Sequence, residues 1–176
     1  LAVQALTLAL FAVSTWRATN SQSDAFIEQA VSAASVSASE KIEELVMGFE
    51  STVNLSTRLI EQRVIPGGMD AETERYLLQS LRTNPVQSAA YLGFGNGEFL
   101  MVSRDATTPG FAYRVKQVRT QGGARTVTLR WFDESLTSGV TTTDPTDTFD
   151  PRSRPWYRAA IAQTSVVWTD PYVFFS

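Results

Sequence analysis

The chain has 176 residues, of which 43% are hydrophobic and 11% aromatic, enough for the core of one domain of ordinary size. Its 15 basic and 18 acidic residues include no basic run, so the sequence carries no electrostatic signature of nucleic-acid binding. The absence of cysteine and histidine excludes a zinc site, a thiol nucleophile, a Ser-His-Asp triad and the usual haem ligands. We therefore predict no metal, no cofactor and no catalytic residue in this region.

Residues 1–16 carry no charge and, at about 1.5 Å per residue, extend about 24 Å, less than the roughly 20 residues that cross a bilayer. Trp16 and Arg17 follow, and such residues anchor helices at the membrane interface. We predict that 1–16 is the outer part of a transmembrane helix whose beginning precedes this sequence. The alternative is a signal-peptide core, although only residues 12–14 approach a cleavage site.

The charges after the membrane segment indicate where the rest of the chain lies. Residues 17–50 hold six acidic and two basic residues. Because positive charge marks cytoplasmic flanks, this balance favours an extracytoplasmic location. We expect a protein of the inner membrane whose residues after about 17 are extracytoplasmic.

A single long helix is predicted over residues 17–65, because this stretch lacks proline and its apolar positions recur at steps of three or four. At about 72 Å it is too long for one compact domain, so we interpret it as a stalk continuous with the membrane helix. The alternative is two or three helices joined near the serine-rich residues 35–39. The stripe comprises Val31, Ala34, Ala38, Ile42, Leu45, Phe49, Val53, Ser56, Ile60 and Val64.

Residues 66–176 are predicted to form a separate α+β module that continues beyond Ser176. Pro66 ends the stalk, and a second helix is expected from Asp70, its N-cap, to Leu81. The later elements are a strand pair at 111–119 and 125–132 joined at Gly122-Gly123, a polar loop at 133–149, a short helix near 155–163, and brief strands at 166–169 and 172–175.

Between the second helix and these later elements, residues 89–102 (AAYLGFGNGEFLMV) alternate as a β-hairpin does. Asn96-Gly97 predicts a two-residue type I′ turn, which would pair Phe94 with Phe99. Gly93 and Gly95 would then thin one face and leave room for something to approach. The opposite, core-facing side would carry Leu92, Phe94, Phe99 and Met101.

The most informative segment for function is residues 150–157, DPRSRPWY, in which two prolines restrict the backbone around the arginines. A helix starting at Pro155 would present unpaired N–H groups to an anion. Beside it, the Arg154 guanidinium can grip a carboxylate through two hydrogen bonds, and Trp156 and Tyr157 can add donors. The alternative is structural: Asp150 pairs with an arginine, Trp156 fills the core and Tyr157 bonds a backbone carbonyl.

The sequence DPRSRPWYRAA, followed by VVWTDPYVFF, resembles the signature of the double Cache (PAS-like) sensor domains of bacterial transmembrane receptors. The resemblance is close over residues 149–176, and the order of elements matches the family over the whole chain. It implies a PAS-like antiparallel sheet that holds a ligand on one face and is carried on a long N-terminal helix. The family's membrane-proximal module would lie beyond Ser176.

The resemblance also implies a set of ligand-binding residues. In members that bind amino acids, the residues matching Arg154 and Trp156 hold the ligand carboxylate, and the one matching Tyr157, with a later Asp, holds the amine. The later Asp would follow Ser176, and Phe149 stands where amino-acid binders have Tyr, so the ligand is an amino acid or another organic acid. Tyr91 completes the predicted ligand-binding set.

The function that follows is a small-ligand sensor region, a homodimer whose output domain lies outside this chain. An adenylate or guanylate cyclase is the favoured output, with a chemoreceptor, a histidine kinase or a cyclic-di-GMP enzyme as alternatives. Two other classes compete. One is a structural, dimerising stalk. The other is an extracytoplasmic hydrolase that uses carboxylates as acid and base, chosen from Asp133, Glu134, Asp144 and Asp150.

Overall fold

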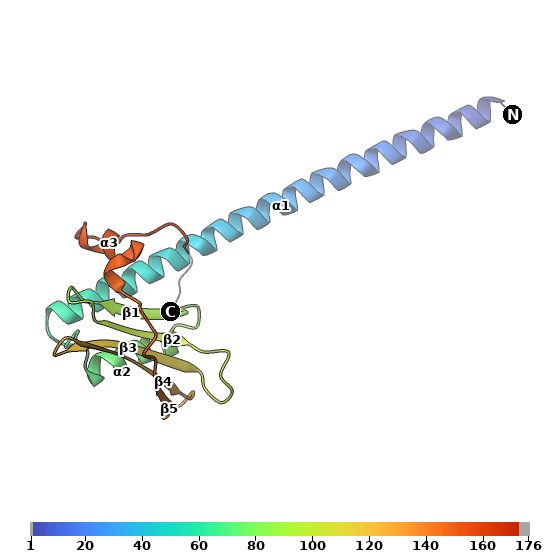
Figure 1. Cartoon of the computed structure of the whole chain (residues 1–176). Helices are drawn as coiled ribbons and strands as arrows, with labels where there is room; N and C mark the ends of the chain where they lie inside the picture. The colour runs from blue at the N-terminus through green and yellow to red at the C-terminus, as the bar shows by residue number, and fades with distance from the viewer. Residues whose placement is uncertain (1, 173–176) are drawn as a thin grey trace. The chain divides into compact units, whose positions relative to one another are not determined.

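The computed structural model describes the backbone of residues 2–172 and the side chains of residues 26–172 (Figure 1). The chain is an α+β protein, with a long helix followed by a five-stranded antiparallel sheet and short helices. The predicted α+β class is therefore confirmed. The chain divides into two units between Thr52 and Val53, so the end of the long helix belongs to the unit that contains the sheet.

Helix α1 is one unbroken helix over Ala2–Glu61, so the alternative of several helices joined near residues 35–39 is wrong. It ends four residues before the predicted position. Arg63 adopts a left-handed φ of 57°, and the amides of Arg63 and Val64 donate to the carbonyls of Ile60 and Leu59. This is the Schellman arrangement, which closes a helix before any proline is needed.

The predicted membrane segment, residues 1–16, lies outside the residues whose side chains are described. Within the described part of the chain, no helix combines the length and the apolar character needed to cross a bilayer. In the described part of the predicted stripe, Val31 and Ile42 are more than half exposed on α1. The membrane location and the homodimer therefore stay predictions.

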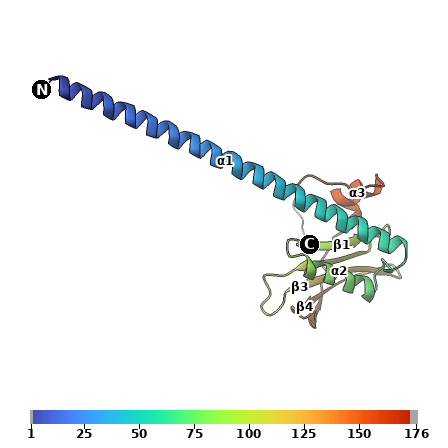
Figure 2. The ribbon, with the colours of Figure 1, turned by 180° about the vertical axis from the view of Figure 1, so that it is seen from behind.

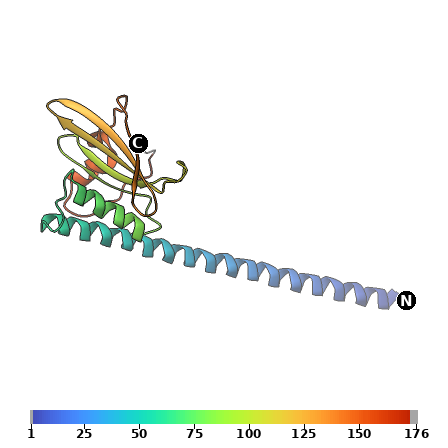
Figure 3. The same ribbon diagram turned by 90° about the horizontal axis from the view of Figure 1, so that it is seen from below.

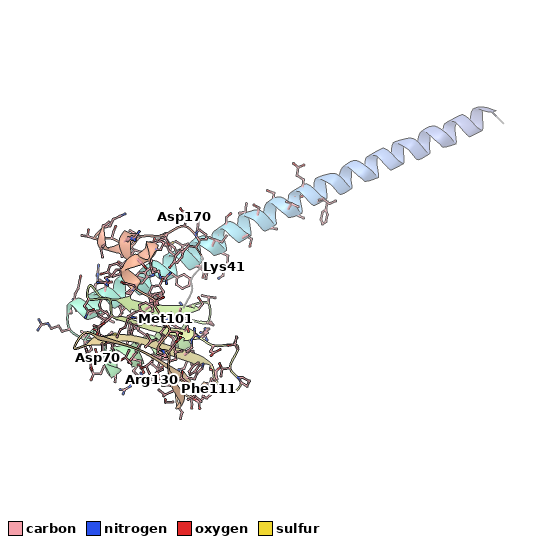
Figure 4. The ribbon with its side chains drawn as sticks, viewed as in Figure 1. Lys41, Asp70, Met101, Phe111, Arg130 and Asp170 are labelled. Atoms are coloured by element: carbon pink, nitrogen blue, oxygen red, sulfur yellow. The ribbon has the colours of Figure 1, made fainter. Side chains whose placement is uncertain are left out.

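Helix α2, over Ala71–Thr83, confirms the predicted second helix and its cap. One Asp70 carboxylate oxygen accepts hydrogen bonds from the amides of Glu72 and Thr73 at 3.0 and 2.8 Å. The other oxygen accepts from the Gly68 amide and the Thr73 hydroxyl. These bonds satisfy N–H groups that the first helical turn leaves unpaired. Figure 4 labels Asp70 at the start of this helix.

Replacing Asp70 with alanine is expected to lower the free energy of unfolding by about 1 to 2 kcal/mol, the usual loss for an N-cap. Burial raises the pKa of Asp70, but hydrogen bonds from Thr73, Gly68 and Glu72 bring it below the ordinary 3.8. The stabilisation by the charged carboxylate is therefore present above pH 3.8 and lost as the pH falls further. Denaturation at pH 7 checks the prediction, and Asp70→Asn, which keeps an acceptor, should lose clearly less than Asp70→Ala.

The sheet has the simple order β1-β2-β3-β4-β5, and every neighbouring pair is antiparallel. Helix α2 covers one face, and the short elements η1 and α3 cover the other (Figures 2 and 3). The last turns of α1 lie beside α2, where the Ser56 and Tyr76 hydroxyls are 2.7 Å apart. The bounds are β1 Ala89–Gly93, β2 Phe99–Arg104, β3 Tyr113–Gln121, β4 Ala124–Phe132, β5 Ser138–Thr143, η1 Pro151–Ser153 and α3 Pro155–Ile161.

The register of the first hairpin differs from the prediction by one residue. Phe99 pairs with Gly93 and not with Phe94. The turn runs from Phe94 to Gly97, with the Gly97 amide donating to the Phe94 carbonyl and only Gly97 at positive φ, +85°. A type I′ turn needs positive φ at Asn96 as well, so a type I turn followed by a left-handed glycine forms instead.

This shift changes which residues share a face, because side chains alternate along a strand. Phe99 and Met101 lie on the face covered by η1 and α3, together with Tyr91 and Gly93. Leu92, predicted to accompany Phe99, packs on the α2 face with Leu100. Strand β2 is consequently buried on both faces.

The second strand pair is confirmed, because Gly122 and Gly123 both have positive φ and join β3 to β4 in a two-residue turn. Two other predictions are wrong. The polar loop at 133–149 contains the exposed edge strand β5, in which β-branched threonines suit extended backbone. Residues 166–169 form no strand, because no described strand pairs with them, and 172–175 lies mostly outside the described residues.

Candidate functional site

The segment 150–157 forms a rigid corner that lies on the β1 side of the sheet. Asp150 caps η1 by accepting the Arg152 amide at 2.9 Å, and the Ser153 hydroxyl donates to the Asp150 carbonyl at 2.7 Å. Pro151 is buried, and Pro155 begins α3 as predicted. Because α3 has only seven residues, its N-terminus contributes little charge, and the side chains must supply the chemistry.

Gly93 determines how closely the corner approaches the sheet. A Cβ atom at Gly93 would lie 2.6 Å from the tip of the Trp156 ring and 3.1 Å from atoms of Pro151 and Tyr157. Gly95, by contrast, has only the Tyr157 hydroxyl nearby, at 3.8 Å. The space predicted on the glycine-thinned face therefore exists, and Trp156 and Tyr157 occupy it.

An aromatic cluster forms between the corner and the sheet. The Trp156 ring centre lies 4.7 Å from that of Tyr91 and 5.6 Å from that of Tyr157. Phe99 joins the group, with its ring centre 5.9 Å from Tyr91 and 4.6 Å from Phe149. These separations are typical of favourable tilted and edge-to-face ring pairs.

Arg154 completes the cluster. Its guanidinium carbon lies 4.4 Å from the centre of the Phe149 ring, a cation-π distance. The five predicted site residues are therefore brought together: Tyr91, Phe149, Arg154, Trp156 and Tyr157.

The two arginines of the corner have different partners. Arg152 forms an ion pair with Asp150 at 2.8 Å. In the structural alternative, Asp150 could pair with either arginine, and the structure shows that its partner is Arg152. Among the described residues, Arg154 has no ion pair and its guanidinium donates no hydrogen bond. Two parts of the structural alternative are therefore found, the pairing of Asp150 with one arginine and the packing of Trp156 against the core, and Arg154 is left without a carboxylate among the described residues.

Two buried donors of the corner lack a partner. The Nε atom of Arg154 and the indole Nε1 of Trp156 are both inaccessible to solvent, and neither donates a hydrogen bond among the described residues. A buried donor without an acceptor costs about 1 to 3 kcal/mol, so such atoms mark places where an acceptor is missing.

A buried ion pair that the sequence analysis missed lies behind Phe149. Lys116, only 1% exposed, has its Nζ 2.5 Å from an Asp147 carboxylate oxygen and 4.7 Å from the Phe149 ring centre. Asp147 also accepts from Arg125 at 3.0 Å and from the Phe149 amide at 2.7 Å. Lys116 lies on the same, corner-facing side of β3 as Val118, and a search for apolar residues overlooks it.

Tyr172 is a second residue that the sequence analysis did not place in the site. Burial, followed by the interaction with Tyr172, raises the pKa of Tyr91 to about 12, and the two hydroxyls share a hydrogen bond. Both phenols are neutral at physiological pH. Tyr91 therefore acts as a hydrogen-bonding and apolar group.

The carboxylates proposed for hydrolysis do not meet the needs of a general acid. Hydrogen bonds from Ser135 and Thr146 lower the pKa values of Asp133 and Asp144, respectively. The hydrogen bond from Arg152 lowers the pKa of Asp150. A general acid needs a raised pKa, so these three aspartates do not fit the role. Among the described residues, no group of three potential ligands could hold a metal ion.

Comparison of the chain with known protein families, with curated proteins and with solved structures finds no match.

Proposed function

We propose that the unit containing the sheet is the ligand-binding part of a sensor, and that it binds a small carboxylate at Arg154 and Trp156. The proposal depends on which of the four cationic side chains near the corner have a carboxylate partner. Arg152 pairs with Asp150, whereas Lys116 and Arg125 share Asp147, so Arg154 is the only one of the four without a carboxylate among the described residues. A guanidinium without a carboxylate partner favours a carboxylate ligand, which it can bind through two hydrogen bonds.

The resemblance to double Cache domains supports placing this unit outside the cytoplasm, as part of a bacterial transmembrane receptor. The output domain of that receptor would lie outside this chain, and we favour a nucleotide cyclase. The described order of elements, a long helix followed by a five-stranded antiparallel sheet, agrees with that architecture. In such a receptor, ligand binding at the corner shifts the long helix by about 1 to 2 Å.

Thermal melting of the full chain with a panel of organic acids and amino acids tests the proposal. A ligand at about 100 times its Kd adds about 2.7 kcal/mol of stability, which raises the midpoint by about 5 °C or more. Arg154→Gln should abolish this shift. The matched control is Arg152→Gln, which removes the same charge two residues away and should keep the shift. A panel without any stabilising compound, or an Arg154→Gln variant that responds like the wild type, would overturn the proposal.

A further inference from the structure

The Phe149 ring contacts two cationic side chains that come from different elements. Lys116, on β3, places its Nζ atom 4.7 Å from the centre of the ring, and Arg154, in the corner, places its guanidinium carbon at 4.4 Å. The face of an aromatic ring is electron-rich and attracts cations at such distances. Phe149 is only 5% exposed, so both contacts are largely shielded from water. One buried ring therefore links the sheet to Arg154.

Hydrogen bonds fix the backbone that carries this ring. The Phe149 amide donates to one Asp147 carboxylate oxygen at 2.7 Å, and the Phe149 carbonyl accepts from Arg125 at 2.7 Å. The other Asp147 oxygen lies 2.5 Å from the buried Nζ of Lys116. Hydrogen bonds to charged groups are strong, and burial strengthens them further. The Lys116–Asp147 pair therefore sets the position of Phe149 relative to β3.

Arg154 is held differently. Among the described residues, its guanidinium has neither a hydrogen-bond acceptor nor a carboxylate partner. An arginine side chain has many rotamers, and ordering it on binding costs conformational entropy. The contact with the Phe149 ring limits where the guanidinium lies before a ligand arrives. A site ordered in advance binds more tightly, because less entropy is lost on binding.

We propose that Lys116 and Asp147 are positioning residues of the ligand site, and that they act on Arg154 through the Phe149 ring. This inference rests on the proposed function, in which Arg154 binds a carboxylate. It deepens that function by naming two residues outside the corner that order the binding guanidinium.

The first test needs no ligand. The full chain reacts with phenylglyoxal, which modifies accessible guanidinium groups, and mass spectrometry follows the rates at Arg152 and Arg154. Phe149→Leu keeps a buried apolar side chain but removes the ring, so it should raise the rate at Arg154 about 3- to 10-fold. Phe149→Tyr keeps the ring and should react as the wild type does. Arg152 is the internal reference, because a general loosening of the corner would raise both rates together.

The same measurement tests the buried pair. Lys116→Met should raise the rate at Arg154 about 2- to 5-fold, and it should add less than about 2-fold when Phe149→Leu is already present, because the pair acts through the ring. Asp147→Asn disturbs the same pair independently and should change the rate in the same direction. Lys41→Met removes a lysine from an exposed ion pair and should leave the rate unchanged.

The second test is binding. Calorimetric titration uses propionate, succinate, L-alanine and L-glutamate as probes. Any probe that loses affinity in Arg154→Gln should also bind about 3- to 10-fold more weakly in Phe149→Leu and with unchanged affinity in Phe149→Tyr.

The outcomes separate the two proposals. If Phe149→Leu leaves the rate at Arg154 unchanged, or raises the rates at both arginines equally, the inference is overturned, and a probe whose binding needs Arg154 would still support the proposed function. If Lys116→Met and Asp147→Asn leave the rate unchanged, the positioning role of the pair is overturned. If the rate at Arg154 rises selectively but no probe binds at up to about 10 mM, the proposed function fails and the ordering of Arg154 stands.

Discussion

Replacing Lys116 with methionine is expected to lower the free energy of unfolding by about 3 kcal/mol, because removing one partner of a buried ion pair leaves the other charge poorly compensated. Asp147 retains Arg125 and the Phe149 amide in this variant, so the loss should fall at the lower end of the range for such pairs. The Phe149 ring also loses a cation at 4.7 Å. Chemical denaturation of the full chain at pH 7 measures the change.

The matched control is the same substitution at Lys41, which pairs with Glu44 at 2.7 Å on α1 while both side chains are more than 60% exposed. Exposed pairs of this kind contribute little, so Lys41→Met should change the free energy of unfolding by no more than about 0.5 kcal/mol. If Lys116→Met loses less than about 1 kcal/mol, the buried pair does not hold the Phe149 segment in place.

The pH dependence provides an independent check on the same pair. Burial raises the pKa of Asp147, but hydrogen bonds from Lys116, the Phe149 amide and Arg125 outweigh it and bring the pKa below the ordinary 3.8. A carboxylate with a lowered pKa stabilises the fold above its unfolded value, and the stabilisation is lost as the pH falls through the folded value. The decline of stability below pH 3.8 should therefore be shallower in Lys116→Met than in the wild type.

Local signals predicted the corner well. Two prolines, a capping aspartate and a run of donors fix the backbone of residues 150–157 within the segment itself, so little long-range information is needed. The same holds for Asp70 at α2 and for Gly122-Gly123 between β3 and β4, whose positive φ values demand glycine. The prediction that Arg154, Trp156 and Tyr157 share a site followed from this local order.

The first hairpin shows where such signals are insufficient. Two turn types compete at the Gly-Asn-Gly sequence of residues 95–97, and they differ by one residue in register. Burial of both faces of β2 by different partners settles the choice: α2 packs against Leu100, and the corner packs against Phe99. Neither partner adjoins the hairpin in sequence.

Residues that act through distant pairing were also missed. Lys116 and Asp147 are 31 positions apart, and each looks like an ordinary solvated charge in its own segment. Edge strand β5 is exposed throughout and has no apolar alternation, so only its pairing with β4 identifies it. These features depend on the tertiary fold, whereas Arg154 was assigned from its own segment, beside the start of the helix at Pro155, and from the resemblance.

The close approach at Gly93 leads to the second prediction of large effect. Gly93→Val should lower the free energy of unfolding by about 2 to 3 kcal/mol, because its Cβ would lie 2.6 Å from the Trp156 ring and force the corner away from β1. Valine is otherwise favoured in a strand, so a loss of stability would report the collision and not the backbone. Denaturation measures the loss, and ligand binding should weaken with it as Trp156 moves.

Two further variants determine whether the collision is the cause. Gly95 lies in the same hairpin, but a Cβ atom there would be 3.8 Å from the nearest atom, the Tyr157 hydroxyl oxygen. The free energy of unfolding of Gly95→Ala should therefore stay within about 0.5 kcal/mol of the wild-type value. The atom that a Cβ at Gly93 meets first is the tip of the indole ring, which phenylalanine lacks. Trp156→Phe combined with Gly93→Ala should therefore lose about 1 kcal/mol less than the sum of the single variants. If the losses simply add, Gly93 and Trp156 are not in contact, and the corner does not lie on β1.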